Sequence, residues 1–299
     1  MENQGAVSAT LKVVSPPFGI FPRVTRRYSL HDGLKRLDIE NSFTKEPGKT
    51  DSAETVFYAF PFAVAGGAFR IDIPGVVARY PEEFRQETEW TYMPAQSFVN
   101  VSNERLSVLL ATREAPNFAF RSMRKFFEHR PLPDLANTTV FAMPLTKQSV
   151  NKHDFDFEGG TYEFHYALTS GPAPFRAADA VRFGWGFQRG FQVLPIENPK
   201  GSLPATKSFL QVDGEGVLLS PLKPADDGRG FIVRVWNPGS QPATGRISLP
   251  DVRITAALRT DLMERDTGGE YERSSDGIRV PCGPREWVTV RLLVSKPVQ

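Results

Sequence analysis

Sixteen residues of this 299-residue chain, NKHDFDFEGGTYEFHY at positions 151–166, hold two of its four histidines and four carboxylates. Histidine and carboxylate side chains are common zinc ligands and common general acids and bases, so this segment is the first place to look for chemistry. A zinc site needs three or four ligands that converge on one point. The segment can therefore hold a metal only if several of these side chains share one face.

Strand geometry separates the histidines from most of the acids. If residues 153–158 are extended, the histidine shares a face with two phenylalanines, and the three carboxylates point to the opposite face. Gly159 and Gly160 then suit a two-residue hairpin turn. On the returning strand Glu163 and His165 lie together, opposite an aromatic face. We therefore expect a structural hairpin without a metal, and we keep Glu163 and His165 as candidate sugar contacts.

A second candidate site is the segment ETEWTYMPAQSF at positions 87–98. Trp90 and Tyr92 fall on one face of a strand. Flat aromatic rings pack against sugar rings, while nearby amides such as that of Gln96 bond hydroxyl groups. Packing in the core explains the two rings equally well, so both interpretations stay open.

Composition excludes several classes of function. The net charge is +2 and no long run of one sign occurs, so the electrostatic footprint of a nucleic-acid-binding protein is missing. No apolar run approaches the ~20 residues that span a bilayer, and the first twenty residues lack a signal-peptide pattern. We expect a cytoplasmic protein with no membrane partner. The single cysteine, Cys282, excludes an internal disulfide and a cysteine zinc cluster.

Alternation of apolar and polar residues with period two recurs along the chain, as at 230–236 and 285–294. A helical pattern occurs only in RSMRKFFEH at 121–129. The sequence therefore predicts an all-β protein of stacked sheets. The segment PIENPKGSLPATKS at 195–208 interrupts the alternation with three prolines, so we expect one domain at 1–197 and a second at 198–299.

Seven phrases, taken in order, resemble the C-terminal β-sandwich region of glycoside hydrolase family 38, the α-mannosidases, and especially its bacterial-type branch. They are YSLHDGLKRLDIENSFTK, ETVFYAFPF, FVNVSNERLSVLLATREAP, GTYEFHYAL, SFLQVDGEGVLLSPLKPADDGRGFIVRVWNP, DLMER and REWVTVRL. The resemblance spans about residues 7–293. It implies a large galactose-mutarotase-like supersandwich followed by a smaller antiparallel β-sandwich.

The same resemblance implies retaining hydrolysis of α-mannosides with a divalent metal, usually zinc, that touches the sugar. In the family, the metal ligands and the nucleophile come mainly from an N-terminal catalytic domain that this sequence lacks. The family's His-x-Asp motif is absent, because His31–Asp32 and His153–Asp154 are adjacent pairs. We carry over no catalytic residue and no metal ligand. We expect no cofactor in this chain, zinc in the catalytic domain, and no activity from this chain alone.

Three functions follow as hypotheses. The first is the noncatalytic C-terminal part of an α-mannosidase-like enzyme, with the catalytic domain in cis or in trans and mannose-containing glycans as ligands. The second is a freestanding carbohydrate-binding module. The third is a mutarotase- or lyase-like sugar enzyme that uses His165 and a glutamate as acid and base, an idea that rests on fold alone.

Overall fold

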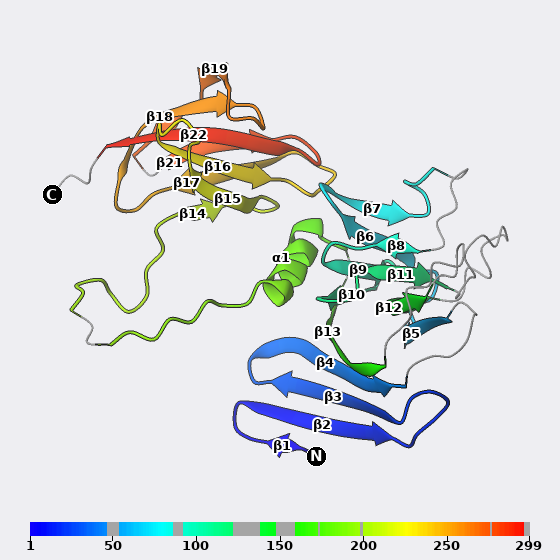
Figure 1. Ribbon diagram of the computed structural model, residues 1–299. Coiled ribbons are helices and arrows are strands. Elements are labelled where there is room, and N and C mark those ends of the chain that lie inside the picture. The colour runs from blue at the N-terminus through cyan, green and yellow to red at the C-terminus, as the bar shows by residue number, and fades with distance from the viewer. Residues whose placement is uncertain are drawn as a thin grey trace. The chain divides into compact units, whose positions relative to one another are not determined.

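The structure is a computed structural model that describes residues 1–46, 54–85, 92–121, 138–147, 159–172, 174–197, 200–275 and 277–295. Nearly all of its regular structure is antiparallel β-sheet (Figure 1), which confirms the all-β fold class. The chain divides into two compact units. The N-terminal unit comprises Met1–Phe175 and Phe183–Gly190, and the C-terminal unit comprises Arg176–Arg182 and Phe191–Gln299. A domain boundary after residue 197 stays a prediction.

The larger sheet of the N-terminal unit has nine strands in the order β1-β2-β3-β4-β13-β10-β9-β6-β7. Its strands in chain order are β1 (Asn3–Gln4), β2 (Ser8–Ser15), β3 (Arg23–His31), β4 (Leu34–Lys45), β6 (Ala68–Ile73), β7 (Val76–Tyr80), β9 (Phe98–Ser102), β10 (Leu106–Thr112) and β13 (Gly160–Pro172). The long strand β13 pairs with β4 on one side and with β10 on the other. It therefore occupies the middle of the sheet.

The second sheet of this unit has four strands, β5 (Glu54–Pro61), β12 (Thr139–Lys147), β11 (Asn117–Phe120) and β8 (Met93–Pro94), in that order. Aromatic side chains join it to the nine-stranded sheet. The ring of Tyr166 on β13 lies 5.3 Å from Phe60 and 6.0 Å from Tyr58 on β5, centroid to centroid. Tyr166 is fully buried and Phe164 is 6% exposed. The aromatic face predicted for this strand is confirmed, and it is the core of the larger sandwich.

Helix α1 (Ala177–Gln188) was not predicted. Its sequence contains Gly184 and Gly186, which lower helix propensity by about 1 kcal/mol each. A Cβ atom on Gly184 would lie 2.5 Å from the Ser97 hydroxyl oxygen, so close packing accounts for this glycine. The helix predicted at 121–129 lies outside the described residues except for Arg121, which has φ +68° and lies in a bend.

The C-terminal unit is a smaller sandwich of two antiparallel sheets. One sheet has the order β14 (Gln211–Asp213), β17 (Ala243–Ser248), β21 (Gly277–Cys282) and β20 (Arg273–Ser274). The other has the order β15 (Leu218–Pro224), β16 (Phe231–Trp236), β22 (Trp287–Ser295), β18 (Arg253–Thr260) and β19 (Asp266–Glu270).

The core of the C-terminal unit is a cluster of aliphatic side chains from both sheets, among them Val233, Ile247, Ile278 and Leu292. Cys282 is buried in this cluster, and burial raises the pKa of its thiol to about 11. A thiol with so high a pKa is protonated and unreactive at neutral pH, as expected for a structural cysteine.

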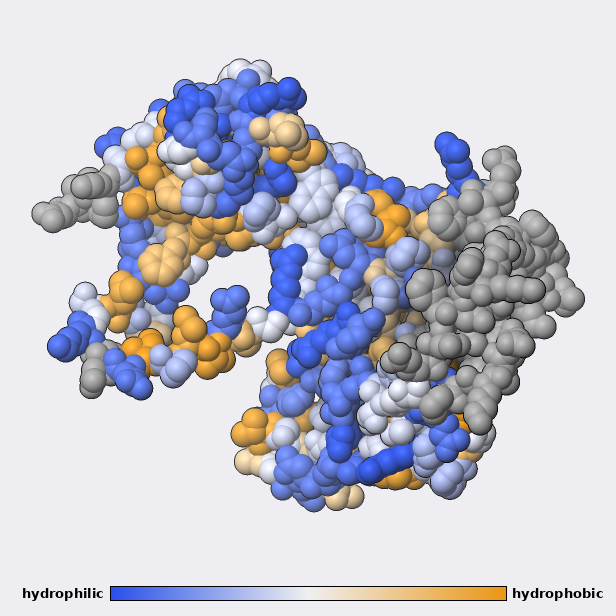
Figure 2. Space-filling view, viewed as in Figure 1, coloured by the Kyte–Doolittle hydropathy of each residue, from blue (hydrophilic) through white to orange (hydrophobic). Residues whose placement is uncertain are grey.

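An extended stretch of the C-terminal unit exposes large apolar side chains. Phe191 is 100% exposed, and Val193, Leu194 and Ile196 are each at least 76% exposed. The stretch is the yellow-green trace in Figure 1, and hydrophobic residues gather along it in Figure 2.

In the described part of the chain no helix is both long and apolar enough to cross a membrane.

Candidate functional site

The structure places the predicted sugar-contact residues in different settings. Trp90 lies outside the described residues. Tyr92 is half-buried just before β8, and its ring centroid lies 6.0 Å from that of Phe57. Burial raises the pKa of the Tyr92 phenol, and a hydrogen bond with Thr55 opposes that rise. The ring contact favours the packing interpretation of Tyr92, and its contact with a sugar stays a prediction.

Gln96 is exposed and joins neighbouring elements through its backbone. Its N–H donates to the carbonyl oxygen of Asp72 at 2.5 Å, and its own carbonyl accepts from Gln188 Nε2 on α1 at 2.6 Å. The contacts of Gln96 are therefore with β6 and α1. Its role toward a sugar stays a prediction.

Glu163 and His165 are the predicted residues that the structure brings together. Both lie on β13, on the face of the nine-stranded sheet opposite the aromatic core, as strand alternation requires. The Nε2 atom of His165 lies 3.1 Å from a carboxylate oxygen of Glu163. About a third of the His165 side chain is exposed, so a ligand in solvent can reach the pair.

Two further glutamates complete a cluster around His165. Glu114, which follows β10, accepts a hydrogen bond from the backbone N–H of His165 at 2.7 Å and lies 2.9 Å from its ring Nδ1. Glu40 on β4 is the cross-strand partner of His165. The ligating atoms of Glu40, Glu163 and His165 all lie within 4.8 Å of one another. We call Glu40, Glu114, Glu163 and His165 the His165 cluster.

Sequence reasoning missed Glu40 and Glu114, because both reach His165 through strand pairing and loop placement. One signal for Glu40 was present. In RLDIENS, at residues 36–42, acidic and polar residues alternate with Leu37 and Ile39, which predicts an outward acidic side chain. Nothing in the sequence indicates that this side chain lies opposite His165, since register depends on the partner strand.

The cluster continues into a row of alternating charges across the sheet. Arg27 on β3 bonds to Glu40, and its Nε donates to Glu2 at 2.7 Å. Lys12 lies 3.2 Å from the same Glu2. These carboxylates hold the pKa of the Arg27 guanidinium above its ordinary value, and Arg27 and Lys12 hold the pKa of Glu2 below its own. Exposed ion pairs of this kind add little to the stability of the fold.

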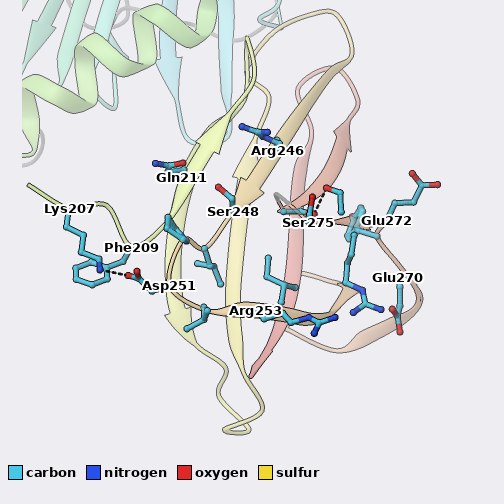
Figure 3. Close-up of a pocket in the computed structure, with 18 of the residues that line it drawn as sticks. Lys207, Phe209, Gln211, Arg246, Ser248, Asp251, Arg253, Glu270, Glu272 and Ser275 are labelled. Atoms are coloured by element: carbon cyan, nitrogen blue, oxygen red, sulfur yellow. Dashed lines mark hydrogen bonds and ion pairs between the residues drawn. The ribbon is translucent and has the colours of Figure 1, made fainter. Parts of the chain in front are cut away.

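A separate feature is an open groove of ≈1600 Å³ in the C-terminal unit (Figure 3). Lys207 contacts Asp251 at 2.8 Å and lies over the ring of Phe209, 5.6 Å from its centroid. Gln211 and Ser248 add polar side chains along the sheet. A groove that combines a ring with amide, hydroxyl and charged groups offers contacts suited to a hydroxyl-rich ligand.

Three of the phrases behind the family resemblance meet around one buried side chain of the C-terminal unit. Arg291 on β22 is 2% exposed, and it bonds to Asp227 at 2.8 Å and to Asp266 at 3.1 Å. Its guanidinium also donates to the backbone carbonyls of Glu264 and Arg229. Asp227 belongs to PADDGRG, Glu264 to DLMER and Arg291 to REWVTVRL.

This arrangement pairs a buried cation fully, which is the condition under which buried charges are tolerated. A backbone N–H of Arg229 and the guanidinium groups of Arg291 and Arg229 lower the pKa of Asp227 to about 2. Lys223 joins the same corner by bonding to Glu264 and Asp226. We call this group the Arg291 network, and it ties the β15–β16 and β18–β19 turns to β22.

Comparison with known proteins gives one family match. Residues 216–290 match the family described as "Glycosyl hydrolases family 38 C-terminal beta sandwich domain". A protein of Halalkalibacterium halodurans whose provisional name is mannosylglycerate hydrolase is 27% identical over 99 residues. That alignment covers 33% of this chain and 10% of the relative.

Two solved structures share the fold. An α-mannosidase from Enterococcus faecalis V583 superimposes with a TM-score of 0.73 and 15% identity over 97% of this chain and 34% of its own. A family 38 glycosyl hydrolase from Enterococcus faecalis gives a TM-score of 0.69 and 16% identity over 91% of this chain and 30% of its own. The predicted resemblance to the C-terminal β-sandwich region of family 38 is confirmed, by sequence at 216–290 and by fold over nearly the whole chain. The chain spans about a third of each solved structure.

Proposed function

We propose that this chain is the noncatalytic C-terminal β part of an α-mannosidase-like glycoside hydrolase, which packs against a catalytic domain in cis or in trans and contacts mannose-containing glycans. The observation that carries the proposal is the asymmetry of the structural match. The α-mannosidase from Enterococcus faecalis shares its fold with 97% of this chain, yet this chain accounts for 34% of that enzyme. A cytoplasmic location is part of the proposal and rests on the sequence.

The sequence supports a noncatalytic role. The family's His-x-Asp metal motif occurs nowhere in the 299 residues. In this proposal the catalytic zinc and the nucleophile of the enzyme belong to the catalytic domain. The β part contributes a rigid scaffold, as the fully paired Arg291 network indicates.

The exposed apolar stretch supports a covering partner. Four large apolar side chains within six residues, from Phe191 to Ile196, are each at least 76% exposed. Burying apolar surface yields about 25 cal/mol per Å², and contiguous exposed apolar residues are typical of surfaces that another domain covers. A catalytic domain is the partner that the match to longer enzymes favours.

Reconstitution tests the proposal. A chain that carries His-x-Asp, taken from the neighbouring reading frame, is co-expressed with this one. We expect a single complex in size-exclusion chromatography that hydrolyses an aryl α-mannoside. Replacing Phe191 and Leu194 with serine should weaken the complex, whereas replacing the exposed Arg229 with alanine should leave it intact. A catalytic chain that is fully active and elutes separately would contradict the proposal.

A freestanding carbohydrate-binding module is the second candidate, and the polar groove around Phe209 favours it. Calorimetric titration with mannose oligosaccharides separates the two. Saturable binding by this chain alone, together with no association with any His-x-Asp chain, favours the module. Weak binding that becomes tight only in the complex favours the mannosidase part.

A further inference from the structure

We propose that Glu40, Glu163 and His165 bind a divalent transition-metal cation of the zinc class, and that Glu114 orients the imidazole for it. This inference goes beyond the proposed function and does not depend on it. No metal was expected from the sequence, because strand alternation counts ligands on one strand only. The structure adds a ligand from β4 and an orienting carboxylate from the turn after β10.

Glu114 fixes the orientation of the His165 ring. One of its carboxylate oxygens accepts from the backbone N–H of His165 at 2.7 Å, and the other lies 2.9 Å from ring Nδ1. A carboxylate accepts only, so Nδ1 carries the hydrogen. In the neutral imidazole the lone pair then lies on Nε2. A carboxylate bonded to one ring nitrogen while the other binds metal is the usual support of zinc-bound histidines.

Ring Nε2 faces further carboxylate oxygens. Glu163 offers an oxygen 3.1 Å away, and the ligating atom of Glu40 lies within 4.8 Å of both. Acceptors this close to each other need a proton or a cation between them. In a tetrahedral zinc site with bonds of ~2.1 Å, neighbouring ligand atoms lie about 3.4 Å apart. Small side-chain rotations therefore convert the cluster into three ligands of a tetrahedral site.

Arg27 is the main competitor for Glu40. Its Nη1 bonds to Glu40 Oε1, which leaves Oε2 as the oxygen that turns to a metal. Arg27 also keeps Glu2 as a partner, through Nε at 2.7 Å, when Glu40 moves. Among the residues that the structure describes, the three carboxylates of the His165 cluster outweigh the Arg27 guanidinium that bonds to them, so the local charge attracts a divalent cation.

The sheet gives the ligands a rigid base. β13 and β4 pair continuously from Gly160 opposite Lys45 to Leu168 opposite Leu37. Ligands on paired central strands hold their geometry better than ligands on loops. Three protein ligands leave a fourth position open to water or to an oxygen of a bound molecule, as in zinc sites that do more than stabilise a fold.

Metal titration of the full chain, freed of metal and of any affinity tag, tests the site. We expect one equivalent of zinc to bind in calorimetry, and cobalt to give the intense visible absorption of a four-coordinate N,O site. Glu163→Gln and His165→Ala should each weaken binding at least tenfold. His31→Ala is the matched control, because His31 is a partly exposed histidine on the same sheet that contacts Asp38 at 2.9 Å.

Glu114 is a positioning residue, and its test differs. Glu114→Gln should weaken zinc binding about 10- to 100-fold and move the pH midpoint of binding, while the thermal midpoint of the metal-free chain changes little. Circular dichroism confirms that each variant folds. Zinc binding that survives Glu163→Gln and His165→Ala, or that is lost equally in His31→Ala, would overturn the proposal. Calcium binding without zinc binding would overturn the class of metal.

Discussion

Asp72 on β6 places a carboxylate in the interior of the N-terminal unit, where it is 0% exposed. Burial raises its pKa to about 6 from an ordinary 3.8, although hydrogen bonds from the side chain and backbone of Ser97 oppose the rise. Its Oδ1 atom has no hydrogen-bond partner within the described residues. The folded chain therefore favours the protonated acid.

The raised pKa of Asp72 predicts that the free energy of unfolding decreases as the pH rises. Because the folded state binds the proton more tightly than the unfolded state, the stabilisation is complete below about pH 4 and is lost as the pH rises to about 6. The loss amounts to at most about 3 kcal/mol. Asp72→Asn removes this titration. Urea unfolding of both proteins at pH 4 and pH 7.5 checks it, and an identical pH dependence in the two would contradict it.

At the scale of elements, helix α1 offers a matched pair of glycines. Gly184 has Ser97 Oγ 2.5 Å from the position of an added Cβ, whereas nothing lies within 4 Å of the Cβ position at Gly186. Gly186→Ala should stabilise the chain by about 0.5–1 kcal/mol through helix propensity. Gly184→Ala should destabilise the chain despite the same gain in helix propensity, because the added Cβ would force Ser97 or the helix to move. Thermal unfolding distinguishes them, and equal effects would contradict this account of the helix.

The Arg291 network predicts how strongly two turns depend on one side chain. Arg291→Ala leaves Asp227 and Asp266 without their buried partner. We expect the free energy of unfolding to fall by about 2–4 kcal/mol, and the partial exposure of both acids limits the fall. Arg229→Ala is the control, because Arg229 is 64% exposed and its pairs lie at the surface. Arg229→Ala should lower the free energy of unfolding by less than about 1 kcal/mol. Urea unfolding measures both, and similar losses would refute the distinction.

At the scale of the whole molecule, the sequence pattern predicted the fold class better than it predicted which distant residues lie in contact. Alternation predicted the all-β fold and the buried face of β13. Helix α1 was missed because two glycines lower its helix propensity, and the packing of Gly184 against Ser97 depends on a distant segment. Glu40 and Glu114 were missed because register and loop position depend on distant parts of the chain.

We propose that this chain alone does not hydrolyse α-mannosides. The most direct measurement is release of the chromophore from an aryl α-mannoside by the purified chain with added zinc, with an intact α-mannosidase as the positive control. We expect no turnover above the buffer blank, because the chain lacks His-x-Asp. Turnover that needs zinc and disappears with a chelator would contradict it.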